Sequence, residues 1–390
     1  MKILIASRVL PHHSIGGMQA VAWDLACKMA EMGHDVTLIT ADVPGRDEVF
    51  TENGVNVICL KGVDWRRYGR QWQQSVRKYC NLSFLASYDV IFGVSAGAVP
   101  LLIYRRRLRA VYLMQAHGTS LGEFISKWQT GRPVNFIKSI KNLVGIVKNM
   151  IAYPQYDVIV PIGAAVMRDF DRLPLSLVRQ AVRILQIDNG INEADFAMDV
   201  RERNRMRSSL FSVADVKVIV TACRLDSQKG VHLSLRAFAR AWRVDNGLRY
   251  LIVGDGPEMS RLKVLSNMLG VESAVHFAGA VPRSSISEYL GCSDLMVFTT
   301  TRIEGLPMNI LEALASGLPC IVSDHVVKRQ RVSTWVNGVN PVNEQEIANL
   351  MLSIELPRSR ASLLPAEFTL DYSVRAYVDA MARFQTARAD

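Results

Sequence analysis

Short apolar runs bounded by turn residues recur along the first half of the chain. They read "KILIAS", "DVTLIT", "VNVICL", "YDVIFGVS", "AVYLMQA", "YDVIVPI" and "VRILQI". Helical patterns, such as Ala20 to Met32, lie between several of these runs. Strands that alternate with helices in this way indicate a parallel sheet with helices on both faces.

The same pattern restarts in the second half. Further buried strands are predicted at "VKVIVTA", "RYLIVGDG", "AVHFAG" and "DLMVFTT", again separated by helical stretches. A turn at Asn189 and Gly190 follows the last strand of the first half, which favours a domain boundary there. The predicted fold class is α/β, with two Rossmann-like doubly wound domains at 1–187 and 188–368 and a C-terminal helical segment at 369–390.

Length and composition agree with two globular domains. The chain has 390 residues, of which 49% are hydrophobic and 21% charged, so disorder is not expected. Its six cysteines contain no C-x-x-C pair, which favours reduced core thiols of a cytoplasmic protein over disulfides or a zinc site. No run of about 18 apolar residues is available to span a membrane. Arg8 ends the first apolar run too early for a secretory leader, so this run is predicted as the first strand.

The charge balance points to an anionic partner. Lysine and arginine number 46 against 36 acidic residues, for a formal net charge of +10. The segment from Lys61 to Arg109 contains ten basic residues and only two acidic ones, Asp64 and Asp89. This excess predicts a basic face on the first domain. A nucleic-acid partner is not expected, because no strand interleaves aromatic and basic residues in the pattern of known binding modules.

The segment 136–153, "FIKSIKNLVGIVKNMIAY", predicts a basic amphipathic helix. Phe136, Ile137, Ile140, Leu143, Val144, Val147, Met150 and Ile151 share one side at helical spacing, and Lys138, Lys141, Asn142, Lys148 and Asn149 share the other. Such a helix can lie on an anionic membrane surface. The alternative is an ordinary helix that covers the sheet with its apolar side and exposes its lysines to solvent.

Two strand-to-helix loops carry residues suited to phosphate. Gly16 and Gly17 precede the first helix, where backbone amides can approach an anion, although a tight turn without a ligand explains them equally well. In the second half, Arg224 and Lys229 lie in a loop that ends at Gly230. Two cations beside a helix N-terminus fit a diphosphate, whereas unrelated surface cations are the alternative.

The stretch "EGLPMNILEALASG" places Glu304 in a loop and Glu312 just over one turn into the following helix. Both should lie at the carboxyl end of the sheet, where open α/β folds bind ligands. Two carboxylates repel a diphosphate placed beside them, but they can accept hydrogen bonds from hydroxyls at the two ends of a larger ligand. A nucleotide sugar has this layout. The alternative is helix-dipole stabilisation by Glu304 and a solvent-facing Glu312.

These motifs occur in a recognisable order: the Gly16 and Gly17 pair, "HG" at 117–118, "NGI" at 189–191, Arg224 with Lys229 and Gly230, "GDGP", and the Glu304 to Glu312 stretch. In this combination the chain resembles glycosyltransferase family 4, the retaining nucleotide-sugar transferases of GT-B fold. The resemblance spans nearly the whole sequence and is densest from Val218 to Asp324.

The resemblance implies a first domain that binds the acceptor, a second domain that binds the donor, and a C-terminal helix that crosses back to the first. It implies that Glu304 meets hydroxyls of the transferred sugar and that Glu312 binds the ribose. Arg224 and Lys229 hold the diphosphate and stabilise the departing nucleotide, and His117 lies beside the sugar C1. The remaining donor contacts implied are Gly16, Gly17, Gly279, Val281, Leu306, Met308 and Asn309.

One departure from this pattern affects the expected chemistry. Pro307 lacks the backbone N–H that relatives have at this position, so no amide contact is expected there. No DxD-type carboxylate pair suited to a metal is identified, so no metal is expected. The donor that the resemblance implies is a UDP-, GDP- or ADP-sugar, with no cofactor. Without a metal, the cations and the helix dipole stabilise the negative charge that develops on the leaving phosphate.

Other activities share this fold. A catalytically inactive scaffold should have lost Lys229 or one of the glutamates, and all are present. A phosphorylase or a sugar-nucleotide epimerase stays open from the sequence. The basic face and the helix at 136–153 favour a lipid-linked sugar or growing glycan of surface polysaccharide or lipopolysaccharide as acceptor, with the protein peripheral on the inner face of the membrane.

Overall fold

The computed structural model describes residues 1–13, 17–129, 133–212, 216–302, 304, 307–328, 334–357 and 360–389. The side chains of residues 17–18, 126–129, 133–141 and 389 are not described. The chain divides into two compact units, Met1–Gly190 with Leu370–Asp390, and Ile191–Thr369. We call them the first and second domains. The sequence placed these boundaries at 187/188 and 368/369, within a few residues of the observed division.

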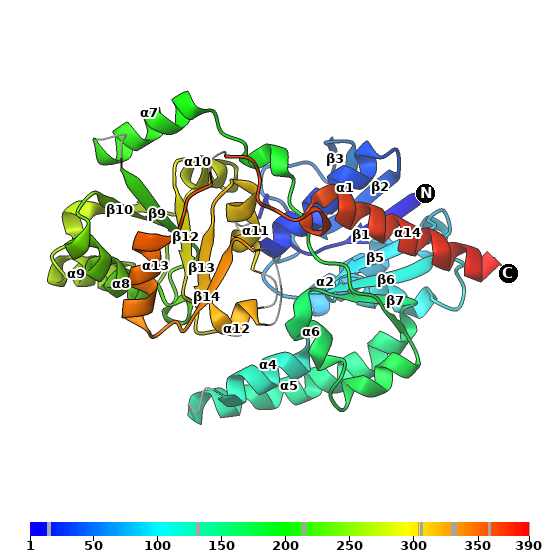
Figure 1. Cartoon of the computed structure of the whole chain (residues 1–390). Helices are drawn as coiled ribbons and strands as arrows, with labels where there is room; N and C mark the ends of the chain where they lie inside the picture. Colours follow the sequence, from blue (N-terminus) through cyan, green and yellow to red (C-terminus); the bar gives the residue numbers. More distant parts are fainter. Residues whose placement is uncertain are drawn as a thin grey trace. The chain divides into compact units, whose positions relative to one another are not determined.

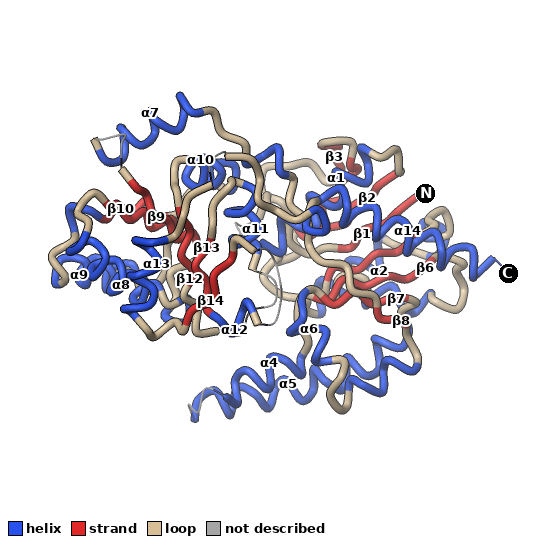
Figure 2. The backbone as a smooth tube through the Cα atoms, in the orientation of Figure 1, coloured by secondary structure: helices blue, strands red, loops and turns tan. Residues whose placement is uncertain are grey.

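The first domain contains an eight-stranded sheet in the order β3-β4-β2-β1-β5-β6-β7-β8 (Figures 1 and 2). Its strands are β1 (Lys2–Ala6), β2 (Asp35–Ala41), β3 (Val49–Glu52), β4 (Val55–Leu60), β5 (Val90–Val94), β6 (Val111–Ala116), β7 (Val158–Pro161) and β8 (Arg183–Ile184). All pairs are parallel except β3 with β4. The apolar runs are buried because helices cover both faces of the sheet.

In the first domain, the sequence pattern missed one strand, β3. It forms a hairpin with β4 through Asn53 and Gly54, whose φ angles of 52° and 77° are those of a tight turn between antiparallel strands. The edge strand β3 alternates exposed and half-buried positions and has no apolar run, which is why the pattern did not reveal it.

The helices of the first domain are α1 (Gly17–Glu31), α2 (Arg70–Tyr79), α3 (Leu82–Leu85), α4 (Ser120–Gln129), α5 (Pro133–Ala152), α6 (Gly163–Asp169) and α14 (Leu370–Ala389). The C-terminal helix α14 belongs to this domain although the second domain precedes it in sequence (Figure 1). Tyr377 of α14 is fully buried, with its ring centroid 5.4 Å from that of Phe92 in β5. This contact fixes α14 against the sheet.

The second domain has a six-stranded sheet in the order β11-β10-β9-β12-β13-β14, and every pair is parallel. Its strands are β9 (Lys217–Ala222), β10 (Leu248–Val253), β11 (Val275–Gly279), β12 (Leu295–Phe298), β13 (Cys320–Ser323) and β14 (Val336–Val339). Strand order reverses between β9 and β12, and the carboxyl end of such a switch point is where open sheets bind ligands.

Helices cover both faces of this second sheet, as two separate apolar clusters show. They are α7 (Val200–Phe211), α8 (Val231–Val244), α9 (Met259–Met268), α10 (Ile286–Gly291), α11 (Met308–Ala315), α12 (Asp324–Val327) and α13 (Glu344–Ser353). The predicted class, two Rossmann-like doubly wound domains, is therefore what the structure contains.

The exposure of helix α5 disagrees with the interpretation that its apolar side covers the sheet. A helix that covers the sheet should bury its apolar side, yet Leu143, Val144, Val147 and Ile151 are 48%, 58%, 59% and 65% exposed. Helix α5 packs instead beside α4, with Ile146 buried and Gly145 close to Ser120 (Figure 1). The covering interpretation is therefore wrong for these four residues, whereas Met150 of the same stripe is half-buried and packs against the core of the first domain. Residues 136–141 of the predicted stripe have side chains outside the description.

In the part of the chain that the structure describes, no helix combines the length and the apolar character needed to cross a membrane.

Candidate functional site

The switch point of the second domain holds a contact between two predicted site residues. Lys229 ends a short 3₁₀ helix, Ser227–Lys229, after β9, and its Nζ lies 2.8 Å from Oε1 of Glu304. Thr300, just after β12, donates a second hydrogen bond to the same oxygen at 3.2 Å. The two side chains are only 21% and 14% exposed. A cation and a carboxylate are thus paired at the carboxyl end of the sheet.

Gly230 is what lets the Lys229 loop lie so close to β12. Its φ of +69° is in the left-handed region, and a Cβ at this position would lie 2.0 Å from the carbonyl oxygen of Thr299. Thr301 N also donates to the Gln228 carbonyl at 2.8 Å, which joins the two loops directly. The glycine therefore positions Lys229 against Glu304.

Glu312 forms a second ion pair in this domain. It lies in α11, is 7% exposed, and accepts a hydrogen bond from Nη1 of Arg283 at 2.9 Å. Burial raises the pKa of Glu312, and the adjacent Arg283 guanidinium opposes this effect without cancelling it. The solvent-facing alternative for Glu312 is therefore wrong.

Arg283 was not identified as a site residue from the sequence. It begins a 3₁₀ helix, Arg283–Ser285, just after β11. Two signals point to Arg283: it lies close in sequence to the predicted donor contacts Gly279 and Val281, and the buried Glu312 needs a cation beside it.

The start of α11 contains two further predicted residues, Met308 and Asn309. Met308 is the first residue of the helix, and Pro307 is its N-cap rather than its first helical residue. Asn309 Nδ2 donates to the carbonyl of Ala222 at 3.0 Å, which ties α11 to the end of β9. Leu306 lies outside the described residues. Gly279 ends β11 with a φ of +72°.

Val281 follows β11 and is 8% exposed, and its side chain packs into the core of the domain. Any contact of Val281 with a ligand is therefore left to its backbone.

Arg224 is not brought into the Lys229–Glu304 contact. Its side chain is 72% exposed, and its Nε lies 3.2 Å from Oδ2 of Asp226. The cation stays available at the surface of the same loop, and only Lys229 touches a predicted carboxylate partner in this structure.

His117 lies at the carboxyl end of β6 in the first domain. Its Nε2 is 2.8 Å from Oε1 of Gln115, whose Nε2 donates to the Tyr377 hydroxyl at 2.9 Å. Because the Gln115 oxygen faces the ring, Nε2 carries the proton and Nδ1 is left as an acceptor. Burial lowers the pKa of His117 to about 4, so the imidazole is neutral at pH 7. Gly17 is the first residue of α1, whereas Gly16 lies outside the described residues.

Arg8 is a second residue that the sequence pattern did not single out. It follows β1, its guanidinium stacks 4.6 Å from the ring centroid of Tyr68, and burial lowers its pKa. Its Nε and Nη1 are buried without a hydrogen-bond partner among the described residues. An unpaired buried donor is unfavourable, so Arg8 is suited to an anionic ligand at the carboxyl edge of the first sheet.

Metal-binding geometry does not occur in the described part of the chain, which contains no group of three or more His, Cys, Asp and Glu side chains placed to hold an ion. A D-x-D spacing exists at Asp169 and Asp171, which the sequence analysis did not single out. Thr119 Oγ1 donates to Asp169 at 2.5 Å, and Arg179 pairs with Asp171. Both carboxylates therefore already have protein partners.

The sequence matches two families over separate stretches. Residues 202–362 match the glycosyl transferases group 1, and residues 16–190 match a glycosyl transferase 4-like domain. With the two doubly wound domains, these matches define the class of the protein as a glycosyltransferase of GT-B fold. The chain belongs to glycosyltransferase family 4, and the predicted fold, family and enzyme class are confirmed.

Individual relatives agree with this assignment. An uncharacterized glycosyltransferase of Methanocaldococcus jannaschii is 24% identical over 376 residues, which cover 87% of this chain and 86% of the relative. The alpha-monoglucosyldiacylglycerol synthase of Acholeplasma laidlawii is 23% identical, with coverage of 87% and 85%.

Two solved structures share the fold. Sucrose-phosphate synthase from Thermosynechococcus elongatus has a TM-score of 0.68 and 18% identity, with coverage of 99% of this chain and 96% of the other. The Anabaena protein HepE, in complex with UDP and glucose, has a TM-score of 0.65 and 18% identity, with coverage of 100% and 98%.

Proposed function

We propose that the protein is a retaining glycosyltransferase that moves a sugar from a nucleotide-diphosphate sugar to a hydroxyl acceptor. The observation that carries this proposal is the Lys229–Glu304 pair at the switch point of the second domain, with the Arg283–Glu312 pair on the same domain. Both pairs hold a carboxylate ready to accept hydrogen bonds from hydroxyls and a cation ready to meet phosphate. The HepE complex with UDP and glucose supports such a donor.

Each side chain then has a defined task. Lys229 shares its ammonium between Glu304 and the diphosphate, and Arg224, which is exposed on the same loop, adds a second cation. Glu304 accepts hydrogen bonds from hydroxyls of the transferred sugar. Glu312 accepts hydrogen bonds from the ribose, and Arg283 favours its ionised form against the effect of burial.

The same residues favour departure of the nucleotide. As the bond from C1 to the leaving oxygen breaks, negative charge grows on the phosphate, where Lys229, Arg224 and the N-terminus of α11 stabilise it. No metal is needed in this scheme. His117 is neutral at pH 7 and adds no positive charge beside the oxocarbenium-like sugar. Attack of the acceptor from the face that the phosphate leaves retains the configuration without a protein nucleophile.

The acceptor we propose is a lipid-linked sugar or glycan. Arg8 supports an anionic group such as a phosphate on the acceptor, because its two unpaired N–H donors lie at the carboxyl edge of the first sheet. Helix α5 supports attachment to an anionic membrane. Its exposed apolar residues Leu143, Val144, Val147 and Ile151 lie next to the exposed Lys148, as expected of a helix in the plane of the interface. The diacylglycerol-glucosylating relative is consistent with a lipid acceptor.

A donor screen tests the core of the proposal. The purified protein is heated in EDTA with UDP-, GDP- or ADP-glucose, and the protein and products are followed by thermal shift and NMR. We expect one donor class to raise Tm. When a lipid-linked sugar is added as acceptor, we expect release of the nucleoside diphosphate and transfer of the glucose to an acceptor hydroxyl with its α-configuration retained. An altered nucleotide sugar with no release indicates an epimerase. If glucose 1-phosphate forms reversibly when orthophosphate is added, the protein is a phosphorylase. If no donor shifts Tm, the result contradicts a preformed donor site.

A further inference from the structure

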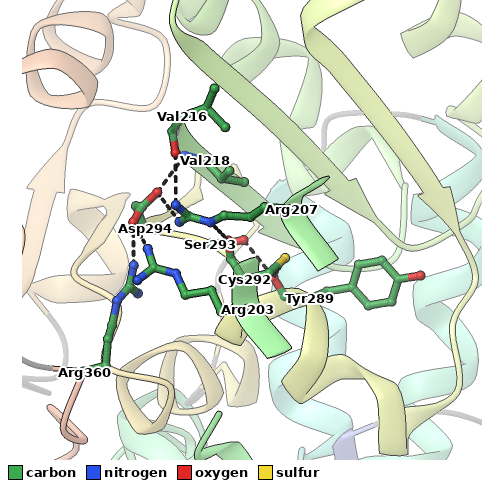
Figure 3. A network of polar contacts seen from close by, with 9 residues as sticks. All are labelled: Arg203, Arg207, Val216, Val218, Tyr289, Cys292, Ser293, Asp294 and Arg360. Carbon is green, nitrogen blue, oxygen red and sulfur yellow. Dashed lines mark hydrogen bonds and ion pairs between the residues drawn. The ribbon is translucent and has the colours of Figure 1, made fainter. Parts of the chain in front are cut away.

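Three arginines converge on one buried carboxylate in the second domain (Figure 3). Asp294, just before β12, has a side chain only 5% exposed. Its Oδ1 accepts from Nη2 of Arg203 and from Nη2 of Arg360, each at 2.5 Å. Its Oδ2 accepts from Nη2 of Arg207 at 2.5 Å and from the backbone N–H of Val218 at 2.8 Å.

Only one of these arginines is fully engaged by the protein. Arg207 also donates from Nε to the Cys292 carbonyl at 2.7 Å and from Nη1 to the Val216 carbonyl at 3.1 Å (Figure 3). It is 6% exposed and ties α7 to β9 and to the loop before β12. A single buried arginine with three partners is sufficient to neutralise Asp294 and to serve a structural role.

Arg203 and Arg360 supply more positive charge than Asp294 needs for neutralisation. Nε of Arg203 and Nη1 of Arg360 are buried without a hydrogen-bond partner among the described residues. Burial lowers the pKa of both groups, that of Arg360 to about 10. A buried cationic N–H without an acceptor is unfavourable, so the arrangement is incomplete by itself.

Lys217 adds to the positive charge. It is the first residue of β9, and burial lowers its pKa although Asp294 and Asp245 act in the opposite direction. The four cations Arg203, Arg207, Arg360 and Lys217 thus interact electrostatically with two carboxylates. An anion with two negative charges would balance them.

A pocket of about 500 Å³ opens beside this cluster. It is lined by Arg203, Asn204, Arg207, Val216, Lys217, Asp294 and Leu356. Lys217 starts β9 and Asp294 precedes β12, so the pocket lies at the amino ends of the strands. Lys229 and Glu304 lie beyond the carboxyl ends of the same strands. The pocket is therefore separate from the proposed donor site.

We propose that this pocket binds a phosphate dianion, either free or as a phosphomonoester. The side chains of Arg203 and Lys217 line the pocket, and Arg360 adds a further positive charge to the same cluster through Asp294. This excess of positive charge favours a dianion in the pocket. Arg203 belongs to α7, and Arg360 to the segment that leads toward α14. The bound anion joins these two segments and stabilises the second domain.

Phosphate titrations of the full chain test this inference. Wild type and Lys229→Ala are titrated with inorganic phosphate at constant ionic strength, set with sodium chloride, while Tm and heat of binding are recorded. Lys229→Ala removes a cation from the donor site, so phosphate binding that is lost in this variant belongs to the donor site. We expect saturable binding to both proteins, with no equivalent effect of chloride. A shift that chloride reproduces, or one that Lys229→Ala abolishes, overturns the proposal.

Variants then locate the site. Lys217→Gln removes a charge without breaking a hydrogen bond that the structure shows, and Arg203→Gln removes a guanidinium that lines the pocket. We expect each to weaken phosphate binding by about tenfold or more. Arg201→Gln, an exposed arginine on the same helix, is the matched control and should bind as wild type does. If Arg203→Gln does not fold, Lys217→Gln decides alone, and unchanged affinity there refutes the site. Glycerol 3-phosphate, run in parallel, tells an ester ligand from free phosphate by its tighter or weaker binding.

Discussion

Nζ of Lys229 lies 2.8 Å from Oε1 of Glu304, although the two residues are 75 positions apart. Before any ligand binds, the cation that should meet the diphosphate already neutralises the carboxylate that should meet the sugar. The pair holds the lysine in place beside a mostly buried glutamate. The diphosphate of a donor competes with Glu304 for the Lys229 ammonium. Because Thr300 also donates a hydrogen bond to Glu304, the carboxylate keeps one partner when the ammonium turns toward the phosphate.

Lys229→Ala should lower kcat/KM for release of nucleoside diphosphate by about 10²- to 10³-fold, because charge on the leaving phosphate loses its nearest cation. The measurement is a steady-state assay with the donor class found in the screen. Lys229→Arg should retain part of the activity. Lys263→Ala, an exposed lysine of α9, is the control and should be unaffected. A rate for Lys229→Ala within twofold of wild type means that this lysine does not contact the phosphate.

Arg283→Met should destabilise the second domain in a pH-dependent way. Glu312 is buried and its pKa is already raised, and loss of Arg283 raises it further. A raised folded-state pKa of an acid costs stability above that pKa and ceases to cost it as pH falls below the unfolded value. We expect the variant to lose about 2 kcal/mol of unfolding free energy at pH 7 and clearly less at pH 4.5, measured by urea denaturation.

The double variant Arg283→Met with Glu312→Leu serves as the control for that experiment. It removes both charges, so most of the lost stability at pH 7 should return. A constant loss at both pH values in the single variant shows instead that packing of the arginine side chain, and not the charge on Glu312, is responsible.

His117 should make folding stability fall as the solution becomes acidic. Its pKa is about 4 in the folded protein against an ordinary value of 6.5, so between these values the unfolded chain binds a proton that the folded chain does not. The sign is therefore destabilising as pH falls from 7 to 4. From pH 7 to pH 5 the contribution amounts to about 2 kcal/mol.

A comparison with His117→Asn isolates this contribution. The other histidines titrate in both proteins and cancel in the difference. We expect wild type to lose about 2 kcal/mol more unfolding free energy than the variant between pH 7 and pH 5. Parallel pH dependences contradict a neutral, buried His117.

The elements that could be predicted from sequence are those whose signal is local. Strands such as Lys2–Ala6 and Lys217–Ala222 are short apolar runs buried on both faces, and Gly230 is required by a close backbone approach. The ion pairs Arg283–Glu312 and Arg360–Asp294 join residues 29 and 66 positions apart, and no local pattern marks such partners. Strand pairing brings them together, so they become visible only in the folded chain.

The orientation of α5 is a further property that its periodicity could not settle. The sequence shows that the helix has an apolar and a polar side. It does not show which of the two sides packs on the protein. In the structure Asn142 and Asn149, assigned to the polar side, are half-buried, while Val144 and Val147 are exposed. A small residue, Gly145, sits close to Ser120 of α4 and lets this side approach its neighbour. Close packing with α4 has thus overridden the hydrophobic pattern.

The exposed side of α5 gives the last prediction. Wild-type protein should float with liposomes that contain phosphatidylglycerol and bind far less to pure phosphatidylcholine, since Lys148 and the net charge of +10 favour an anionic surface. Val144→Asp with Val147→Asp places two carboxylates in the apolar stripe and should reduce binding about tenfold or more. Val264→Asp, at a residue of α9 that is 60% exposed, is the matched control and should bind as wild type does. If the double variant still floats, another surface contacts the lipid. If instead it changes a dimer into a monomer, the exposed side of α5 is covered by a second copy of the chain, because apolar residues this exposed are otherwise unfavourable in water.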